Sequence, residues 1–520
     1  MKGKSFLELL TVFLFSFFVY SANIGGLYIY SLDEAKNSEC AREMLERGDL
    51  IVPTFNYELR TDKPPVHYYF MMIAYKFFGV NEFSARFFSS FFGALLVLIT
   101  FLFSKRYFGY KVAFLSSLGL VSSIHMAVQF HMAVPDPYLI FWINASLFSF
   151  FVWYKERKLL FLYLFYLFTG IGVLTKGPVA VVLPFLTVFL FLFVIKRENL
   201  TFVKEMKLLK GILLISAVSL PWYIAVYMKT NGEWVKEFIL KHNIHRFSQP
   251  MEGHDGFFAL TFIYVFVGML PFSVFIIQTF KKVWDNRKNE VLGFLLLFFT
   301  VYTVFFSISK TKLPNYTVPV YPSLAILISY YLSSIKRASK SFYISLIFYI
   351  FLTLLIVVAL YYGIKGEKEI KDLSYLSFYF LLLPVGGVLS VLFLRRNLSL
   401  SIASLSLSSV FVSILFFFFL YPKIDKRNPV AKMLPLIDTK KEVRFYQSFN
   451  PAFVFYIRKH IKPVKKQGLN AFFSSSDRVY LLSRKKYKKD ILKVKNANLL
   501  KEVKDLFENK TSVLFSNVIK

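Results

Sequence analysis

The chain has 520 residues, 56% of them hydrophobic, and a formal net charge of +32 at pH 7. Its mean hydropathy of +0.53 excludes a water-soluble globular enzyme or binding module, and we expect no nucleic-acid partner. Its one cysteine, Cys40, excludes an internal disulfide. The composition therefore predicts a mostly α-helical, polytopic membrane protein.

Apolar segments of about 20 residues, the length that crosses a bilayer, recur along most of the chain. The first follows Lys2 and Lys4, as in a signal peptide, but Tyr20 stands where cleavage after Ala22 requires a small residue. We therefore interpret this segment as an uncleaved anchor. A transmembrane domain is predicted over residues 1–421, with about thirteen spans at roughly 5–24, 83–104, 112–130, 137–154, 159–173, 178–195, 211–228, 257–280, 291–308, 317–335, 341–362, 373–394 and 398–421.

Lysine and arginine gather in alternate loops between these segments, as is typical of the cytoplasmic side of a membrane. The loop 196–210 holds five of them, whereas His131–Pro137 on the opposite side holds none. Only Gly363–Asp372, with three lysines, departs from the trend. The pattern predicts a cytoplasmic N-terminus. An odd number of spans then leaves residues 422–520 on the outer side of the membrane.

Residues 422–520 are charged rather than apolar, with 24 Lys and Arg against 8 Asp and Glu. Short β-like runs at Val443–Tyr446 and Arg478–Leu482 alternate with helix-like runs at Leu469–Ser474 and Leu499–Phe507, which predicts a small α/β domain. Its positive charge either forms a solvated basic surface or attracts anionic lipid headgroups.

A long polar loop, residues 25–82, separates the first two spans. Helical spacing predicts one helix at Glu34–Arg47, ended by Gly48, and a second, amphipathic helix at His67–Phe78 along the membrane surface. Asp33 directly follows the first span, so we expect the membrane interface to desolvate its carboxylate in part. Taken alone, Asp33 is better explained as a helix cap.

Four other loops on the same predicted side also carry polar groups. These are Asp136 at a helix start, Lys176 in a tight turn, His242, His245 and His254 around Arg246, and Lys310, Lys312 and Tyr316 at a membrane edge. Singly, caps, snorkelling lysines and hydrogen-bonded histidines explain them. Because all four loops lie on the same predicted side of the membrane, we favour a single functional site that contains these residues. Arg, Lys and Tyr donors suit a lipid phosphate, and a nearby carboxylate could orient or deprotonate a nucleophile. The histidines with Asp62 could bind a divalent metal.

A series of short motifs runs through residues 1–335 in a fixed order: Asp33-Glu34-Ala35, Arg42-Glu43-Met44, Gly48-Asp49, Pro53, Lys63-Pro64, Asp136-Pro137, Leu174-Thr175-Lys176-Gly177, Pro221-Trp222, Arg246-Phe247, His254, Leu270-Pro271 and Lys312-Leu313-Pro314 with Tyr316. Their order and spacing resemble those of the bacterial aminoarabinose transferase family. That family belongs to the protein-mannosyltransferase-like glycosyltransferases of the GT-C fold, which depend on lipid-phosphate sugars.

The resemblance implies a polyprenyl (undecaprenyl) phosphate-linked sugar as donor, transfer on the periplasmic face of a bacterial inner membrane, and inversion at the anomeric carbon. It implies catalytic roles for Asp33 and Asp136, and substrate binding by Lys36, Lys63, Lys176, Arg246, Lys312 and Tyr316. Among these, Lys63, Arg246 and Tyr316 match positions that hold the lipid phosphate. The family has a precedent for a zinc site, which would be formed here by Asp62 and His254. Two residues depart from the family pattern: Asp62 replaces Glu, and Lys36 replaces an Arg and lacks its bidentate fork.

We therefore expect a monomeric glycosyltransferase that moves a sugar from polyprenyl phosphate to lipid A or a related envelope glycolipid, amid the membrane lipids. A protein O-mannosyltransferase of the same fold is one alternative. A transporter or flippase of lipid-linked sugars is another, but it needs ionisable residues within its spans, and here they crowd one edge. A membrane anchor that presents the basic tail would not require the long first loop.

Overall fold

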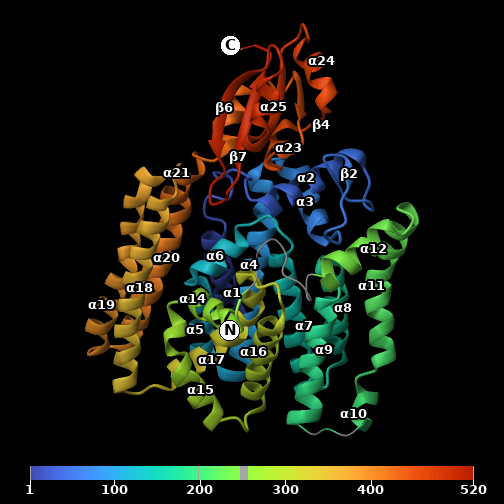
Figure 1. Ribbon diagram of the computed structural model, residues 1–520. Helices are drawn as coiled ribbons and strands as arrows, with labels where there is room; N and C mark the ends of the chain where they lie inside the picture. The colour runs from blue at the N-terminus through green and yellow to red at the C-terminus, as the bar shows by residue number, and fades with distance from the viewer. Residues whose placement is uncertain (1, 197, 199, 246–255, 519–520) are drawn as a thin grey trace.

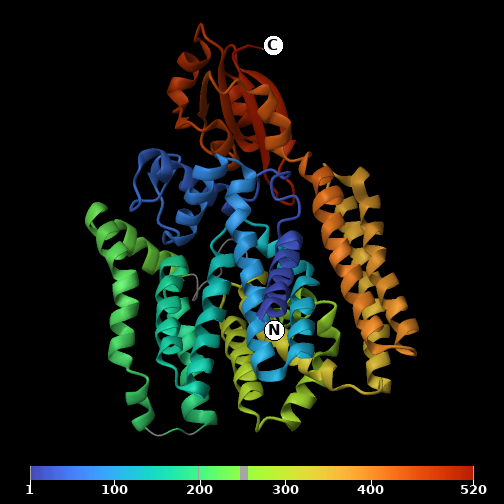
Figure 2. The same ribbon diagram turned by 180° about the vertical axis from the view of Figure 1, so that it is seen from behind.

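The computed structural model describes residues 2–196, 198, 200–245 and 256–518. Three layers are stacked along the long axis of the molecule (Figure 1 and Figure 2). A sheet-containing C-terminal domain lies at one end, the helices of the first long loop lie beneath it, and a wide bundle of apolar helices forms the rest. The predicted mostly α-helical, polytopic architecture with a small C-terminal α/β domain is confirmed.

The first half of the bundle surrounds one central helix, α7 (Asp136–Glu156). All of its residues from Asp136 to Tyr154 are buried, because α4, α6, α8 and α9 pack around it. The other elements of this half are α1 (Lys2–Tyr20), α4 (Glu82–Phe108), α5 (Tyr110–Val121), α6 (Ile124–Phe130), α8 (Leu159–Lys176), α9 (Val179–Phe189), η1 (Leu190–Ile195), α10 (Leu200–Glu205), α11 (Leu208–Lys229), α12 (Glu233–Ile239) and η2 (Leu240–His245).

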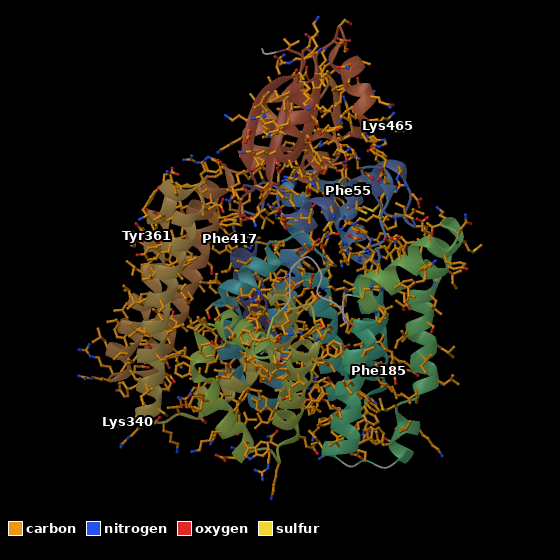
Figure 3. The ribbon with its side chains drawn as sticks, in the orientation of Figure 1. Phe55, Phe185, Lys340, Tyr361, Phe417 and Lys465 are labelled. Carbon is orange, nitrogen blue, oxygen red and sulfur yellow. The ribbon has the colours of Figure 1, made fainter. Side chains whose placement is uncertain are left out.

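The second half adds helices around this centre and a separate group beside it. It consists of α14 (Leu260–Gly268), η3 (Phe272–Phe275), α15 (Ile276–Asp285), α16 (Glu290–Ile308), η4 (Pro314–Val320), α17 (Tyr321–Ser334), α18 (Lys340–Gly366), η5 (Lys371–Leu381), α19 (Leu382–Leu394), α20 (Leu398–Leu415) and η6 (Phe416–Leu420). Helices α18–α20 stand together at one side of the bundle (Figure 1). Figure 3 shows Lys340 at the end of α18 that points away from the C-terminal domain, and Tyr361 near its other end.

Each of the thirteen predicted apolar segments falls on one or more helices, but not all of these are straight spans. Within the described residues, eight helices are long and apolar enough to cross a membrane, and two bent pairs raise the number to ten. The pairs are α5 with α6, bent by 67°, and α14 with the segment Phe272–Asp285, bent by 114° beside Pro271. Shorter apolar helices cover Phe6–Tyr20 and Val179–Ile195. The number thirteen therefore stays a prediction.

The first long loop folds as α2 (Leu32–Arg47), a small hairpin of β1 (Thr54–Phe55) and β2 (Glu58–Leu59), and α3 (Val66–Phe78). Both predicted helices are confirmed, and Gly48 ends α2 in a left-handed conformation with a φ of 65°. The N-cap position of α2 is occupied by Ser31, and Asp33 follows in the first turn. The simple capping role considered for Asp33 is therefore not the one it has here.

A buried ion pair fixes the start of α2 against α4. The guanidinium of Arg86 donates from Nε and Nη2 to the two carboxylate oxygens of Glu34, at 2.7 and 2.9 Å. The remaining nitrogen, Nη1, donates to the backbone carbonyls of Ile24 and Leu27. The backbone N–H of Ala133 also donates to Glu34. This network sets the position of Asp33, which directly precedes Glu34 in α2.

We expect Glu34→Ala to destabilise the protein by about 3–5 kcal/mol, because it leaves the Arg86 guanidinium buried without its carboxylate. Thermal unfolding in lipid nanodiscs measures the loss. The matched control is Asp477→Ala, which removes a carboxylate from the exposed Lys441–Asp477 pair and should hardly change the unfolding temperature. Equal effects of the two substitutions would contradict a stabilising role of the buried pair.

The C-terminal domain is built on one mixed sheet with strand order β4-β3-β5-β7-β6. Strands β3, β4 and β5 are parallel to one another, and β7 runs antiparallel to both β5 and β6. The elements are α21 (Tyr421–Asp425), α22 (Pro429–Met433), η7 (Leu434–Leu436), β3 (Glu442–Phe445), α23 (Ala452–Ile457), β4 (Lys462–Pro463), η8 (Lys466–Gly468), α24 (Leu469–Phe473), β5 (Val479–Arg484), η9 (Lys485–Tyr487), α25 (Lys488–Leu492), β6 (Asn498–Lys504) and β7 (Thr511–Ser516).

Three of the four local predictions for this domain hold. The two β-like runs form β3 and β5, and the run Leu469–Ser474 forms α24. The helix predicted at Leu499–Phe507 is wrong, because Asn498–Lys504 forms the edge strand β6. Pairing with β7 supplies the backbone hydrogen bonds, and a bulge between Leu499 and Lys501 shifts the register of the strand. The bulge disturbs the alternation that would have revealed a strand in the sequence.

The domain is docked onto the first loop by hydrogen bonds between side chains of the loop and the backbone of the domain. The side-chain amide of Asn56 donates to the carbonyl of Ile461 at 3.0 Å, and the Ile461 N–H donates back to the amide oxygen at 2.9 Å. The backbone N–H of Leu506 donates to the hydroxyl of Tyr30 at 2.9 Å. These contacts join the domain to the turn between β1 and β2 and to the segment just before α2.

Candidate active site

A cavity of about 460 Å³, here called the membrane cavity, opens among α7, α9, α12, α16 and η4. Its polar lining comes from helix ends and from the first loop: Asp62, Lys63, Asp136, Lys176, His242, Ser309, Asn315 and Tyr316. Its apolar lining comes from within the helices and includes Leu139, Ile140, Ile143, Val179, Val182, Leu183, Phe238, Ile239, Tyr302, Phe305 and Phe306. The membrane cavity is therefore amphipathic, with charge at the end near the first loop and hydrocarbon along the helices.

One wall of the membrane cavity is both apolar and accessible. Val182 of α9 lines the cavity, and 49% of this residue is exposed. An apolar wall of this kind suits a hydrocarbon chain.

Asp136 and Lys176 form an ion pair at the polar end. Asp136 is the first residue of α7, and Lys176 is the last residue of α8, which Gly177 ends with a φ of 83°. The Lys176 ammonium lies 2.6 Å from Asp136 Oδ1 and 5.1 Å from the centre of the Tyr316 ring. The side-chain amide of Asn315 donates to the same carboxylate oxygen at 3.0 Å. The carboxylate thus holds one cation in a fixed place at the mouth of the apolar walls.

Asp62 holds a second polar group beside this pair. Its carboxylate lies 3.1 Å from Nε2 of His242 and 3.2 Å from Nη2 of Arg60. Burial alone would raise the pKa of Asp62, but the hydrogen bond with His242 and the positive charges of Arg60 and Lys63 hold it well below its ordinary value. Asp62 is therefore ionised at neutral pH.

Helix α12 clamps the backbone around Asp62. The Trp234 indole donates to the carbonyl of Arg60 at 2.8 Å, and the hydroxyl of Thr61 donates to Glu237 at 2.8 Å. The same segment ends at Lys63, whose following proline starts the turn into α3. Lys63 is thereby presented to the cavity from a backbone that is fixed on both sides.

Asp33 and Lys36 lie on α2, and neither is among the described residues that line the membrane cavity. Asp33 is exposed and Lys36 is half-buried. Burial lowers the pKa of the Arg60 guanidinium, but nearby acidic groups, Asp62 and Asp33 among them, raise it overall. Arg60 thus connects Asp33 electrostatically with the carboxylate that lines the cavity.

A buried polar cluster lies between α2 and α3 beside Arg60. Arg60, His67 and Tyr68 each place a polar atom 3.3 Å from the side-chain oxygen of Asn37. Burial lowers the pKa of His67 well below its ordinary value, so its ring is neutral. Within the described chain, Asn37 Nδ2, His67 Nδ1 and two nitrogens of Arg60 are buried without a hydrogen-bond partner. Buried polar atoms without a partner are costly unless a bound group or water satisfies them.

Comparisons with known proteins agree on one family. Residues 10–235 match the family model for dolichyl-phosphate-mannose-protein mannosyltransferase. An uncharacterized protein of Aquifex aeolicus is 30% identical over 486 residues, which cover 90% of each chain. The undecaprenyl phosphate-alpha-4-amino-4-deoxy-L-arabinose arabinosyl transferase of Pectobacterium carotovorum is 30% identical over 351 residues, which cover 65% of this chain and 61% of that protein. The match to this transferase thus covers about three fifths of its length.

The fold has been seen before in crystals. ArnT from Cupriavidus metallidurans, bound to undecaprenyl phosphate, superposes with a TM-score of 0.84 over 100% of this chain and 99% of that one, at 19% sequence identity. The chain belongs to the ArnT-like family of GT-C glycosyltransferases. The family-model match and the transferase relatives confirm the predicted family and enzyme class, and the superposition confirms the GT-C fold.

Several predicted site residues of this glycosyltransferase lie away from the membrane cavity or outside the described residues. Lys312 is buried, and its ammonium donates to the carbonyl of Ser309 at 2.7 Å. Arg246 and His254 fall in 246–255, outside the described residues. In the part of the chain that the structure describes, no group of three His, Cys, Asp or Glu side chains could hold a metal ion. The zinc site at Asp62 and His254 therefore stays a prediction.

Two residues of the site were not singled out in the sequence. Arg60 lies three residues before the Lys63-Pro64 motif, and Asn315 lies between Pro314 and Tyr316, but neither residue type is diagnostic by itself. Their importance comes from contacts to Asp62 and Asp136, which lie on other elements of the fold. An unusually polar residue beside a recognised motif was the only available signal.

Proposed function

We propose that this glycosyltransferase moves a sugar from a polyprenyl-phosphate donor to an envelope glycolipid on the periplasmic side of the bacterial inner membrane. The observation that carries the proposal is the amphipathic membrane cavity, whose apolar walls suit a prenyl chain and whose lysines suit its phosphate. The name of the Pectobacterium carotovorum relative and the ligand of the Cupriavidus metallidurans crystal point to the same donor.

In this mechanism the acceptor oxygen attacks the anomeric carbon while the bond from that carbon to the phosphate oxygen breaks. Polyprenyl phosphate departs with the bonding electrons, so negative charge grows on the phosphate in the transition state. The ammonium groups of Lys63 and Lys176 stabilise that charge, because they stand at the polar end of the cavity before the reaction begins. Tyr316 contributes a hydroxyl donor at the same end.

The transferred sugar occupies the space between the lipid phosphate and Asp33. Arg60 lies 3.2 Å from Asp62, and two of its nitrogens, like Asn37 Nδ2, are buried without a hydrogen-bond partner within the described residues. Hydroxyl or amino groups of a sugar would satisfy them. Attack from the Asp33 side, opposite the departing phosphate, inverts the anomeric carbon.

The proposed acceptor is lipid A or a related glycolipid. The family model that matches residues 10–235 is named for protein mannosyltransferases, which keeps protein hydroxyls as the second candidate acceptor. Mass spectrometry of envelope lipids and glycoproteins, with and without the gene, separates the two. If deletion of the gene removes the sugar from the lipids, the proposed acceptor is supported. If deletion removes the sugar only from proteins, the acceptor is a protein instead.

We expect Lys63→Ala to weaken the binding of undecaprenyl phosphate by about tenfold to a hundredfold, since it removes a charge-assisted contact worth about 1.5–3 kcal/mol. Thermal shift of the purified protein, titrated with the lipid in detergent micelles, measures the affinity. Lys76→Ala is the matched control, because Lys76 is an exposed lysine on α3 of the same loop. An unchanged affinity in Lys63→Ala would remove this residue from the phosphate site.

A further inference from the structure

A second cavity, of about 520 Å³, lies between the C-terminal domain and the first loop. We call it the interdomain cavity. Its walls come from the loop after β3, the end of β5 with η9, the turn between β6 and β7, and the segment Tyr30–Leu32 before α2. Two separate parts of the chain therefore have to come together to form it.

The interdomain cavity lies where a sheet of this kind binds ligands. Strands β3 and β5 are parallel neighbours, and the cavity takes its lining from the residues that follow both of them, Ser448–Pro451 and Arg484–Lys486. In sheets with parallel strands, ligands bind outside the carboxyl ends, where the loops of neighbouring strands diverge. The position of the cavity in the sheet is therefore evidence for a ligand site that does not depend on which residues line the cavity.

The lining carries four cations and one carboxylate. Arg484 is buried and is held by Asp505, and Lys485 pairs with Glu502 at 2.8 Å. Lys486 is exposed, and in the described chain no carboxylate lies within ion-pair distance of its ammonium. Lys510 is exposed by 63% and lies 3.3 Å from Glu508. The cavity therefore presents positive charge to a ligand, which favours an anion such as a phosphate.

The remaining lining suits a sugar. Phe449 and Tyr30 offer aromatic surfaces, and Ser448, Asn509 and Thr511 offer hydroxyl and amide groups. Carbohydrates have apolar faces that pack on rings and hydroxyls that need donors and acceptors. Cations with aromatic and amide groups in one cavity match a phosphorylated sugar better than either a bare anion or a purely apolar ligand.

The start of α2 adjoins the interdomain cavity. Leu32 lines this cavity, and the candidate catalytic residue Asp33 is the next residue of the chain. Among the described residues, Asp33 itself lines neither the interdomain cavity nor the membrane cavity. The interdomain cavity is therefore next to the segment that carries Asp33.

We propose that the interdomain cavity binds the phosphorylated sugar headgroup of the acceptor, an inference that rests on the proposed glycosyl transfer. The C-terminal domain then has a direct part in substrate selection.

The test reverses the two exposed cations of the cavity in the full-length protein, as Lys486→Glu with Lys510→Glu. Glucosamine 1-phosphate is the soluble probe, and glucosamine, which lacks the phosphate, is its control. A phosphorylated glycolipid in nanodiscs is the membrane probe. We expect the variant to lose about tenfold or more in affinity for the phosphorylated probes, while it binds undecaprenyl phosphate as the unmodified protein does. The milder pair Lys486→Gln with Lys510→Gln should show a smaller loss.

The matched control is Lys465→Glu with Lys493→Glu, which changes the net charge equally at exposed lysines of the same domain outside the cavity. Lys465 projects from the edge of that domain (Figure 3). Equal losses in both pairs, or no loss in the cavity pair, would overturn the proposal. Binding of the glycolipid alone identifies a lipid headgroup, and equal binding of glucosamine 1-phosphate identifies a soluble phosphosugar. Retained binding in a protein that transfers no sugar would refute the proposed function but not the site.

Discussion

Replacing Asp33 by alanine should abolish sugar transfer, with a rate loss of at least about a hundredfold, while expression and membrane insertion stay normal. Asp33 is exposed in the first turn of α2, so its removal costs little packing. A radiolabelled-donor assay in nanodiscs measures transfer. Full turnover in the variant would take Asp33 out of the mechanism.

A second substitution, Asp33→Asn, distinguishes two roles for this carboxylate. If the acceptor is a hydroxyl, it must lose a proton as it attacks, and an amide cannot accept that proton. If the acceptor is a phosphate, whose second pKa is near 6, it is already an anion at neutral pH and needs no base. Activity retained by Asn but not by Ala therefore indicates that Asp33 orients groups. Glu58→Ala, at an exposed carboxylate of the same loop, is the control and should transfer normally.

The second large effect is expected at the ion pair of the membrane cavity. Lys176→Ala should slow transfer about a hundredfold, since it removes one preorganised cation worth about 3 kcal/mol to the departing phosphate. Asp136→Ala should have a comparable effect, because the ammonium then loses the carboxylate that lies 2.6 Å away and holds it in place. The double substitution should be little worse than either single one, as residues that act as a unit are not additive.

A matched control exists on the same helix. Lys158 precedes α8 at its other end and is exposed by 64%, so Lys158→Ala should leave the rate unchanged. Strictly additive rate losses for Lys176→Ala and Asp136→Ala would contradict a coupled pair. Steady-state kinetics at saturating donor separates this loss of rate from a loss of donor affinity.

Much of the fold could be predicted from the sequence because the bilayer simplifies the problem. Apolar runs of span length, basic alternate loops and the stop at Gly48 are local signals, and the helices α2 and α3 were found from them. The bends could not be found in this way. Whether Pro271 tilts a span or folds it back by 114° depends on which helices pack beside it. The strand β6 was missed for a related reason, since its partner β7 decides its conformation.

The candidate site was less accessible to sequence reasoning. A shared membrane side suggested that Lys63, Asp136, Lys176 and Tyr316 lie together, and all four line the membrane cavity. Their roles stay predictions. The sequence could not reveal that Asp136 and Lys176 are paired, because they are the ends of two different helices. Nor could it separate Asp33 and Lys36 from the cavity lining, because that depends on how α2 is tied to Arg86.

The apolar walls of the membrane cavity determine how the enzyme is supplied. A donor whose prenyl chain lies along these walls keeps that chain in the hydrocarbon layer, and the spent polyprenyl phosphate returns to the same layer. Turnover then depends on how many donor molecules occupy each unit of membrane area, not on any concentration in the surrounding water. Stiffer bilayers, in which long chains diffuse slowly, should delay the exchange of carriers even when the chemistry itself is unaffected.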